Sequence, residues 1–401
     1  MDTRGLDLLL TPDGWAFLGG LPPYDEAQAL QLGSALRAQG MDADLVAAAL
    51  TQSRLRAKAA AKFGEFAGSM LFTPDGLEQA TRLEIAARHA RRFARAEMSR
   101  VGDLGCGIGG DALALAALGL GVLAVELDEL TARIAAVNLR PFPEARVRHG
   151  DALATDLDGL DAVFMDPARR TRRGTRVFDP ASYSPNLDAV LELRHRRPLG
   201  VKVGPGVPYS ALPSETHAEW IGIDGSVVEA GLWFGPLAGE GSGRSALVLG
   251  TDAQGRRTSH HLTWRGDADA PAATAPTGPL GHYLYEPDGA VIRSGLLSLV
   301  CSELDGRLVD PSIAYITTDH AAASPFATGY RVLDSFGFGL KRLRAYLRER
   351  GVGRLTIKKR GTAVTPEALR PQLQLKGPGE ATIVLTRVAG AQSVLVVEPL
   401  T

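Results

Sequence analysis

Residues Val101–Gly110 read VGDLGCGIGG, an apolar run followed by four glycines within six residues, and the helical pattern DALALAAL comes directly after. Glycine permits the left-handed backbone of a tight turn and leaves space for a ligand close to the main chain. A strand, a glycine turn and a helix in this order begin a sheet in which strands and helices alternate. This segment therefore predicts an α/β fold with a ligand site at the turn.

Short β-rich runs continue this rhythm through the middle of the chain, and helical patterns separate the first five. Alternating strands and helices indicate a Rossmann-like parallel sheet with helices on both faces. The last two runs are close enough together to form a hairpin that completes the sheet. The runs are Val101–Leu104, Val122–Glu126, Arg146–His149, Ala162–Met165, Gly200–Val203, Trp220–Ile223 and Val227–Phe234.

The chain has 401 residues, too many for one ordinary core, and we expect three domains. Residues 1–95 form a helical domain, because Ala-, Leu- and Arg-rich runs without interior proline fill it. Residues 96–250 hold the sheet, and linker compositions such as DADAPAATAPTGP follow. Residues 281–401 mix a helical pattern with β-rich runs, which predicts a small α+β domain. Helices are expected at Ala27–Leu36, Asp42–Leu50, Ser53–Phe63 and Phe338–Arg350.

Composition narrows the class of protein. No run of eighteen apolar residues exists, so no membrane span is expected, and the N-terminus lacks the apolar run of a signal peptide. Cys106 and Cys301 cannot build a disulfide framework, and no CxxC pattern indicates a structural metal. We therefore expect a cytoplasmic protein without a metal. The net charge of −1 does not by itself suggest nucleic acid.

The glycine turn fits two classes of cofactor. Gly105, Gly107 and Gly110 match the G-x-G-x-x-G spacing of dinucleotide-binding folds. Gly105, Gly107 and Gly109 equally match the G-x-G-x-G spacing of S-adenosylmethionine (SAM) enzymes. The glycines alone leave both an NAD-dependent oxidoreductase and a SAM enzyme open.

Carboxylates at the ends of three successive strands favour SAM. Asp103, two residues before the first glycine, can bind the ammonium group of a methionine moiety, whereas it would repel a pyrophosphate. Glu126 ends the second strand, where it can accept hydrogen bonds from both ribose hydroxyls. Asp151 follows the third strand, where it can bind the adenine amino group. These strand ends meet at the carboxyl edge of a parallel sheet, which is where ligands bind.

The fourth strand ends in Asp166-Pro167-Ala168-Arg169. This motif resembles the Asp/Asn/Ser-Pro-Pro-aromatic motif of class I SAM-dependent methyltransferases that act on amines. A carboxylate and a fixed backbone carbonyl that accept both amine hydrogens free the nitrogen lone pair for methylation. Ala168 replaces the second proline and Arg169 replaces the aromatic residue, although a guanidinium can also stack on a base. The resemblance implies that Asp166, Pro167 and Arg169 are catalytic.

Other methyl-transfer chemistries fit less well. Carbon-5 methylation of a pyrimidine needs a cysteine nucleophile, and neither Cys106 nor Cys301 lies at the fourth strand. Ribose 2′-O methylation usually employs a Lys-Asp-Lys-Glu set, of which Asp166 and Lys202 supply half. We keep the second chemistry as a minor option.

Basic residues cluster in two segments. Five arginines lie between Asp166 and Arg176, and nine Lys or Arg residues lie between Lys341 and Arg360, with one acid in each segment. Such clusters suggest a polyanionic substrate, because phosphate contacts supply much of the affinity for nucleic acids. The residues predicted to contact the substrate are Arg170, Arg172, Arg173, Phe178 and Lys202.

Seven segments carry a resemblance over most of the chain: LFTPDGLEQATR, DLGCGIGGDALALA, FMDPARR, KVGPG, VVEAGLWFG, YLYEPDGAVIRSG and GRLTIKKRG. Together they resemble a bacterial family of class I methyltransferases with a C-terminal THUMP-like domain. The DLGCGIGG core is also similar to trimethylguanosine synthase-type RNA methyltransferases, which act on a guanine N2. THUMP domains deliver RNA to a linked enzyme, so the resemblance implies an RNA substrate, tRNA or rRNA. It implies SAM contacts at Asp103, Gly105, Gly107 and Glu126, with Phe72 and Thr73 covering the cofactor.

The first hypothesis is therefore a SAM-dependent methyltransferase that acts on an exocyclic base nitrogen of RNA, with Asp166 and Pro167 orienting the amine. A SAM-dependent methyltransferase of protein or small-molecule amines is the first alternative, but it leaves the basic clusters unexplained. An NAD-dependent oxidoreductase is another, although it assigns no role to Asp166. A module that binds SAM without turnover also stays open, because Ala168 and Arg169 depart from the motif.

Overall fold

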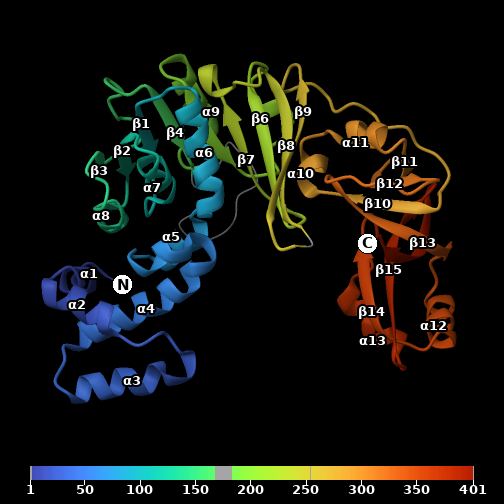
Figure 1. Cartoon of the computed structure of the whole chain (residues 1–401), viewed down its shortest axis with the longest axis horizontal. Helices are drawn as coiled ribbons and strands as arrows, with labels where there is room; N and C mark the ends of the chain where they lie inside the picture. The colour runs from blue at the N-terminus through green and yellow to red at the C-terminus, as the bar shows by residue number, and fades with distance from the viewer. Residues whose placement is uncertain (1, 168–182, 253, 401) are drawn as a thin grey trace. The chain divides into compact units, whose positions relative to one another are not determined.

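The computed structural model describes residues 2–167, 183–252 and 254–400. The chain divides into two compact units, one of residues 1–202 and 232–239 and one of residues 203–231 and 240–401 (Figure 1). The domain boundaries expected near residues 95, 250 and 281 remain predictions. No helix in the described part of the chain is long and apolar enough to cross a membrane.

Helices form the N-terminal part of the first unit, as predicted. Side-chain caps begin several of them; Asp42, for example, accepts hydrogen bonds from the backbone N–H groups of Asp44 and Leu45. The prediction of separate helices at 42–50 and 53–63 is wrong, because neither glycine nor proline interrupts the chain between them. The helices are α1 Thr3–Leu9, α2 Pro12–Gly20, α3 Glu26–Ala38, α4 Ala43–Phe63, α5 Pro74–Gln79 and α6 Leu83–Arg95.

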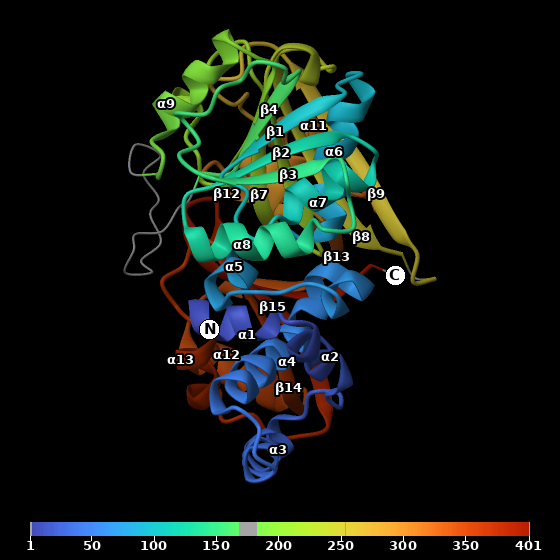
Figure 2. The same cartoon turned by 90° about the vertical axis from the view of Figure 1, so that its left-hand side faces the viewer.

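The strands of the first unit form a sheet in the order β3-β2-β1-β4-β5, followed by the end of β7. Parallel pairs join β1 to β2 and β4, β2 to β3, and β4 to β5. Figure 2 shows α7 (Gly110–Ala117) and α8 (Glu129–Asn138) beside these strands. This is the α/β methyltransferase-like sheet that the sequence predicts. Its strands are β1 Arg100–Leu104, β2 Gly121–Glu126, β3 Ala145–His149, β4 Ala162–Met165, β5 Leu199–Val203 and β7 Ser226–Trp233.

One predicted feature of the sheet is wrong. The connection between β3 and β4, residues 150–161, contains no helix. Two of its aspartates instead bind the backbone of their own turns: Asp151 Oδ1 accepts from the N–H of Leu153 and Asp156 Oδ1 from that of Asp158. Short polar side chains of this kind compete with helical hydrogen bonds.

The second unit contains the predicted hairpin. Strand β6 (His217–Ile223) neighbours β7, and the two residues between them, Asp224 and Gly225, have φ values of 50° and 81°. Positive φ at both central residues is typical of the tight turns that match the twist of a hairpin. Strand β8 (Gly243–Thr251) pairs with β6 in parallel, and β9 (Arg257–Arg265) pairs with β8 antiparallel.

A second, mixed sheet forms the C-terminal region, in the order β11-β12-β10-β13-β16-β15-β14. Leu343 and Leu347 of α12 pack against one side of it, which agrees with the predicted α+β arrangement. The elements are β10 Tyr283–Pro287, α10 Gly289–Arg293, α11 Leu297–Glu303, β11 Arg307–Asp310, β12 Ile313–Thr318, β13 Ala327–Gly337, α12 Leu340–Glu349, β14 Val352–Lys359, α13 Pro366–Leu373, β15 Gly379–Val388 and β16 Ala391–Pro399.

Candidate active site

The turn after β1 has the left-handed backbone that its glycines suggest. Gly105, Gly107 and Gly109 have φ values of 88°, 56° and 86°. A Cβ atom at Gly107 would meet nothing within 4 Å, so the backbone there borders open space. A Cβ atom at Gly109 would instead lie 3.6 Å from side-chain atoms of Ala135 in α8 and of Leu139, which directly follows α8. Gly105 and Gly107 line a cavity, whereas Gly109, the third glycine of the G-x-G-x-G spacing predicted to contact the cofactor, faces α8 and is not among the lining residues.

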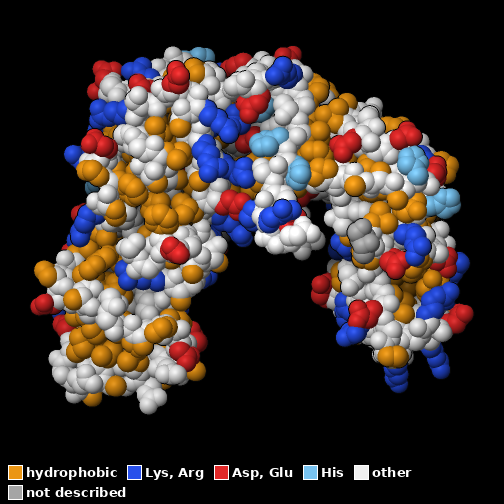
Figure 3. All heavy atoms as spheres, viewed as in Figure 1, with side chains coloured by type: hydrophobic (Ala, Val, Ile, Leu, Met, Phe, Trp, Pro, Cys, Tyr) orange, Lys and Arg blue, Asp and Glu red, His pale blue; other side chains and the backbone are white. Residues whose placement is uncertain are grey.

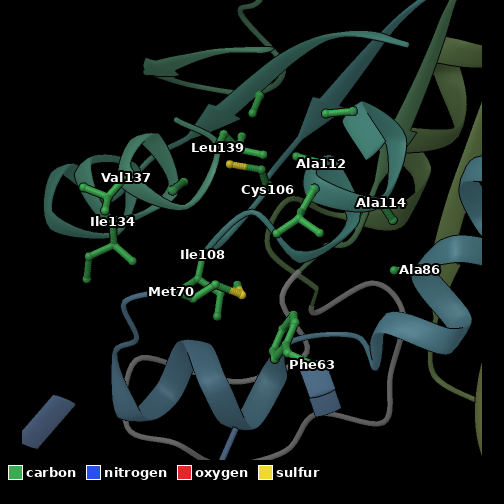
Figure 4. Packing of buried hydrophobic residues seen from close by; sticks show 14 of the residues in the cluster. Phe63, Met70, Ala86, Cys106, Ile108, Ala112, Ala114, Ile134, Val137 and Leu139 are labelled. Atoms are coloured by element: carbon green, nitrogen blue, oxygen red, sulfur yellow. The ribbon is translucent and has the colours of Figure 1, made fainter. Parts of the chain in front are cut away.

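Buried groups from the helical region hold this turn in place. Figure 4 shows the side chains of Ile108 and Met70 next to each other, with Phe63 of α4 nearby. Asn138 Nδ2 donates to the carbonyl oxygens of Leu71 and Ile108 at 3.0 and 2.8 Å, and Asn138 Oδ1 accepts from the N–H of Leu71 at 2.8 Å. The fully buried amide thus connects the glycine turn to the segment ahead of α5.

A cavity of about 520 Å³ lies at this turn. The carboxyl ends of β1, β2, β4 and β5 reach it, and the segment from Thr73 to Thr81 lines it as well. Its lining residues are Thr73, Asp75, Gly76, Glu78, Gln79, Ala80, Thr81, Asp103, Gly105, Cys106, Gly107, Ile108, Gly110, Asp111, Glu126, Asp128, Thr131, Asp166, Pro167 and Lys202.

Asp103 is the strongest indication of what the cavity binds. Its side chain is 1% exposed, and its Oδ2 atom has no hydrogen-bond partner among the described residues. Burial, helped by the nearby carboxylates of Asp111 and Asp166, raises the pKa of Asp103 well above its usual range. A buried carboxylate oxygen without a partner is costly unless a cation meets it. The ammonium group of SAM fits this position.

Glu126 joins the glycine turn to the loop after β2. Its two carboxylate oxygens accept hydrogen bonds, each of 2.9 Å, from the backbone N–H groups of Gly107 and Asp128. Each oxygen keeps a second lone pair, so the carboxylate can still accept hydrogen bonds from a ribose. This geometry suits the predicted role of Glu126.

Two predicted cofactor contacts besides Gly109 lie elsewhere. Asp151 is not among the lining residues, and its carboxylate closes a local turn. The Phe72 side chain is fully buried, with its ring centroid 5.7 Å from that of Phe63, and only the neighbouring Thr73 lines the cavity. Five other predicted residues lie outside the described residues: Arg169, Arg170, Arg172, Arg173 and Phe178.

Asp166 lies in the same cavity at the end of β4. Its side chain is 27% exposed, and Lys202 Nζ lies 2.5 Å from Asp166 Oδ2. The same ammonium group donates to Thr81 Oγ1 at 3.0 Å, and Thr81 in turn donates to Asp111 Oδ2 at 2.6 Å. Asp111 Oδ1 lies 2.9 Å from His89 Nδ1. The structure thus places Asp166, Pro167 and Lys202 in one cavity with Asp103.

Sequence reasoning missed most of the segment from Thr73 to Thr81. Lys62 holds it, because Lys62 Nζ donates to the carbonyl oxygens of Leu77, Glu78 and Ala80 at 2.8 to 2.9 Å. Desolvation lowers the pKa of Lys62 to about 8. The sequence of this segment contains no local signal that it borders a cavity.

The fold, the glycine turn and the unpartnered carboxylate oxygen of Asp103 are together typical of a SAM-dependent methyltransferase. The chain is 34% identical over 350 residues to an uncharacterized SAM-dependent methyltransferase of Mycobacterium tuberculosis, covering 84% of this chain and 92% of the relative. The chain belongs to this family of SAM-dependent methyltransferases, and its cofactor is SAM. This assignment answers the cofactor question against the NAD-dependent alternative.

Two further comparisons agree with the architecture. Residues 327–399 match a THUMP domain-like family, and residues 2–59 match a domain of unknown function, DUF8688. The crystal structure of a candidate methyltransferase from Porphyromonas gingivalis superposes with a TM-score of 0.69 at 20% identity, covering 94% of this chain and 99% of that one. This likeness shows the shared fold.

Proposed function

We propose that this protein methylates an exocyclic amino nitrogen of a base in RNA. The observation that carries the proposal is the position of Asp166 and Pro167, which line the same cavity as Asp103 and the glycine turn. SAM, when bound, supplies a methyl group whose bond to sulfur breaks as its bond to the acceptor nitrogen forms.

Asp166 and the carbonyl oxygen of Pro167 each accept one hydrogen of the acceptor amine. These contacts pull the nitrogen lone pair out of conjugation with the base ring and direct it into the cavity. The pyrrolidine ring of Pro167 restricts the backbone, so its carbonyl needs little rearrangement during the reaction. Positioning of this kind supplies most of the acceleration. Asp166 can also take up the proton that the methylated nitrogen releases.

Lys202 supports a neutral acceptor. Its ammonium group lies next to Asp166 and neutralises part of the negative charge of that carboxylate, so less of this charge remains to bind an alkylammonium substrate. Such a substrate must also lose a proton before it can react, because its amine has an ordinary pKa near 10. The amino group of a base is already neutral. The pair of Lys202 and Asp166 therefore favours the amino group of a base over a lysine side chain or a polyamine as the acceptor.

The C-terminal region supports RNA as the carrier of that base. It contains the THUMP domain-like segment, and exposed Lys341, Arg342 and Arg348 lie on α12, where Figure 3 shows Lys and Arg side chains at the surface. Four of the nine basic residues between positions 341 and 360 pair with acids instead. The charged groups of Lys341, Arg342 and Arg348 stay exposed and are available for phosphates.

The proposal is tested by comparing Asp166→Asn with the wild type. Asp158→Asn is the matched control, because its side chain is 91% exposed and lies outside the cavity lining. We expect Asp166→Asn to slow methyl transfer to RNA at least a hundredfold while its affinity for SAM, measured by calorimetry, stays within threefold. Full transfer by Asp166→Asn, or labelling of a non-RNA amine by the wild type, contradicts the proposal.

A further inference from the structure

We propose that Lys202 is a positioning residue that acts through Asp166, and that Thr81, Asp111 and His89 hold it in place. This inference rests on the proposed role of Asp166 at the acceptor amine. It changes the expected role of Lys202, which the sequence suggested as a direct substrate contact.

The geometry places Lys202 behind Asp166. The lysine is 4% exposed, and its Nζ atom contacts Asp166 Oδ2 at 2.5 Å and Thr81 Oγ1 at 3.0 Å. An ammonium group with so little exposure needs acceptors within the protein. By engaging Oδ2, Lys202 fixes the rotation of the carboxylate and directs Oδ1 to the acceptor amine.

The support for Lys202 comes from three further elements. The Thr81 hydroxyl donates its hydrogen to Asp111, so its oxygen can only accept from Lys202. Asp111 lies in the first turn of α7 and His89 lies in α6, and these two residues are 8% and 3% exposed. The buried chain of hydrogen bonds therefore fixes the ammonium group against rigid helices as well as the sheet.

The negative charges of the neighbouring carboxylates explain why the site needs a cation at the position of Lys202. Burial alone would raise the pKa of Asp111, but the hydrogen bond and charge of His89, with Lys202 and Thr81, bring it below its usual value. Asp111 is therefore an anion close to Asp103 and Asp166. Without Lys202, three carboxylates would crowd one end of the sheet, and Asp166 would take up a proton or turn away. Either change removes an acceptor for the amine.

The test compares Lys202→Met and Lys202→Arg, with Lys58→Met as the matched control on the exposed face of α4. We expect Lys202→Met to lower kcat about a hundredfold, with the Kd for SAM and the KM for the acceptor within about threefold. Lys202→Arg should recover part of kcat, and Thr81→Val should lose about tenfold. An unchanged kcat in Lys202→Met, or an equal loss of SAM binding, overturns the inference.

A double-variant cycle separates action through Asp166 from an independent effect. Asparagine at position 166 keeps a carbonyl acceptor, so residual transfer by Asp166→Asn is measurable in single-turnover assays. Adding Lys202→Met to Asp166→Asn should change kcat less than threefold, whereas losses that multiply overturn the inference. If Asp166→Asn itself retains full activity, the proposed function fails; if only Lys202→Met does, this inference alone fails.

A crystallographic comparison needs no acceptor. In Lys202→Met crystals the Asp166 carboxylate should leave the position it has in the wild type. In Lys58→Met crystals it should not move. A carboxylate that stays in place without Lys202 contradicts the positioning role.

Discussion

Asp103 and Asp111 are carboxylates buried at the same end of the sheet, but their electrostatic states are opposite. Burial raises the pKa of Asp103 well above its usual range, whereas His89, Lys202 and Thr81 outweigh burial and lower the pKa of Asp111. Asp111 already has its partners within the protein. Asp103 keeps an unpartnered oxygen, which suits a ligand that brings its own positive charge.

Replacing Asp103 with asparagine should weaken SAM binding and stabilise the free protein. A charge-assisted hydrogen bond contributes about 1.5–3 kcal/mol, so the Kd for SAM should rise roughly tenfold to a hundredfold. The Asp103 carboxyl group keeps its proton to a higher pH in the folded protein than in the unfolded chain. The folded state therefore binds more protons, and stability falls as pH rises from about 4 to the raised pKa.

Asparagine does not titrate, so Asp103→Asn should lack the fall in stability with rising pH that Asp103 causes in the wild type. The unfolding temperature of the ligand-free variant should exceed that of the wild type, by a margin that grows as the pH rises from about 4 toward the raised pKa of Asp103. Asp158→Asn should show no such margin. A variant that is less stable at every pH, or that binds SAM normally, would contradict the assigned role of Asp103.

Gly107→Ala should impair the cofactor site more than the fold. The backbone at Gly107 has φ 56° but open space around a Cβ, so the substitution adds strain of about 1 kcal/mol without a clash. Gly119 is a matched control, with φ 82° and an equally open Cβ, away from the cavity lining. Both alanine variants should lose similar stability in urea unfolding, but only Gly107→Ala should lose SAM affinity. Equal SAM affinities of Gly107→Ala and Gly119→Ala would mean that the alanine side chain at position 107 does not reach the space that SAM occupies.

Asn138→Ala should loosen the glycine turn. The substitution removes three buried hydrogen bonds to the backbone of Leu71 and Ile108, and leaving such groups unsatisfied should cost about 3 kcal/mol in the free energy of unfolding. Hydrogen exchange of the amides from 105 to 108 should become faster in the variant. Unchanged exchange in a destabilised variant would mean that Asn138 supports the fold but not the turn.

Removal of charge from α12 should weaken RNA binding in a salt-dependent way. Replacing exposed Lys341 and Arg348 with alanine should reduce the slope of log affinity against log salt by roughly 0.7–0.9 for each phosphate that the protein no longer neutralises. Arg354→Ala is the matched control, because Arg354 already pairs with Glu380. SAM affinity should stay constant in all variants. Equal slopes for the paired and unpaired positions would exclude α12 from the RNA-binding surface.

The glycine turn and the end of β4 were predictable because their signals are local. A strand, its terminal carboxylate and the following glycine or proline lie within a few residues, and parallel strand ends meet at one edge. The chain of hydrogen bonds that connects His89 to Lys202 was not predictable. Thr81 and Lys202 are 121 positions apart, and nothing in either neighbourhood marks them as partners. Only packing of helices on the sheet brings them together.

Local chemistry also explains the predictions that the structure does not support. Asp151 stands at a strand end, but its carboxylate accepts from Leu153 within its own turn. The segment after it lacks the expected helix for the same reason. Four of the basic residues between positions 341 and 360 form ion pairs, a pairing that composition alone cannot reveal.

The most direct measurement uses tritiated SAM, the purified protein and total RNA from a strain that lacks its gene, with Asp166→Asn and Asp158→Asn in parallel. We predict that the wild type and Asp158→Asn label one RNA fraction, that Asp166→Asn labels it at least a hundredfold more slowly, and that nucleoside digestion places the label on an amino-methylated base. Proven SAM binding without label in any RNA, or label on a ribose or a ring carbon, would contradict the account.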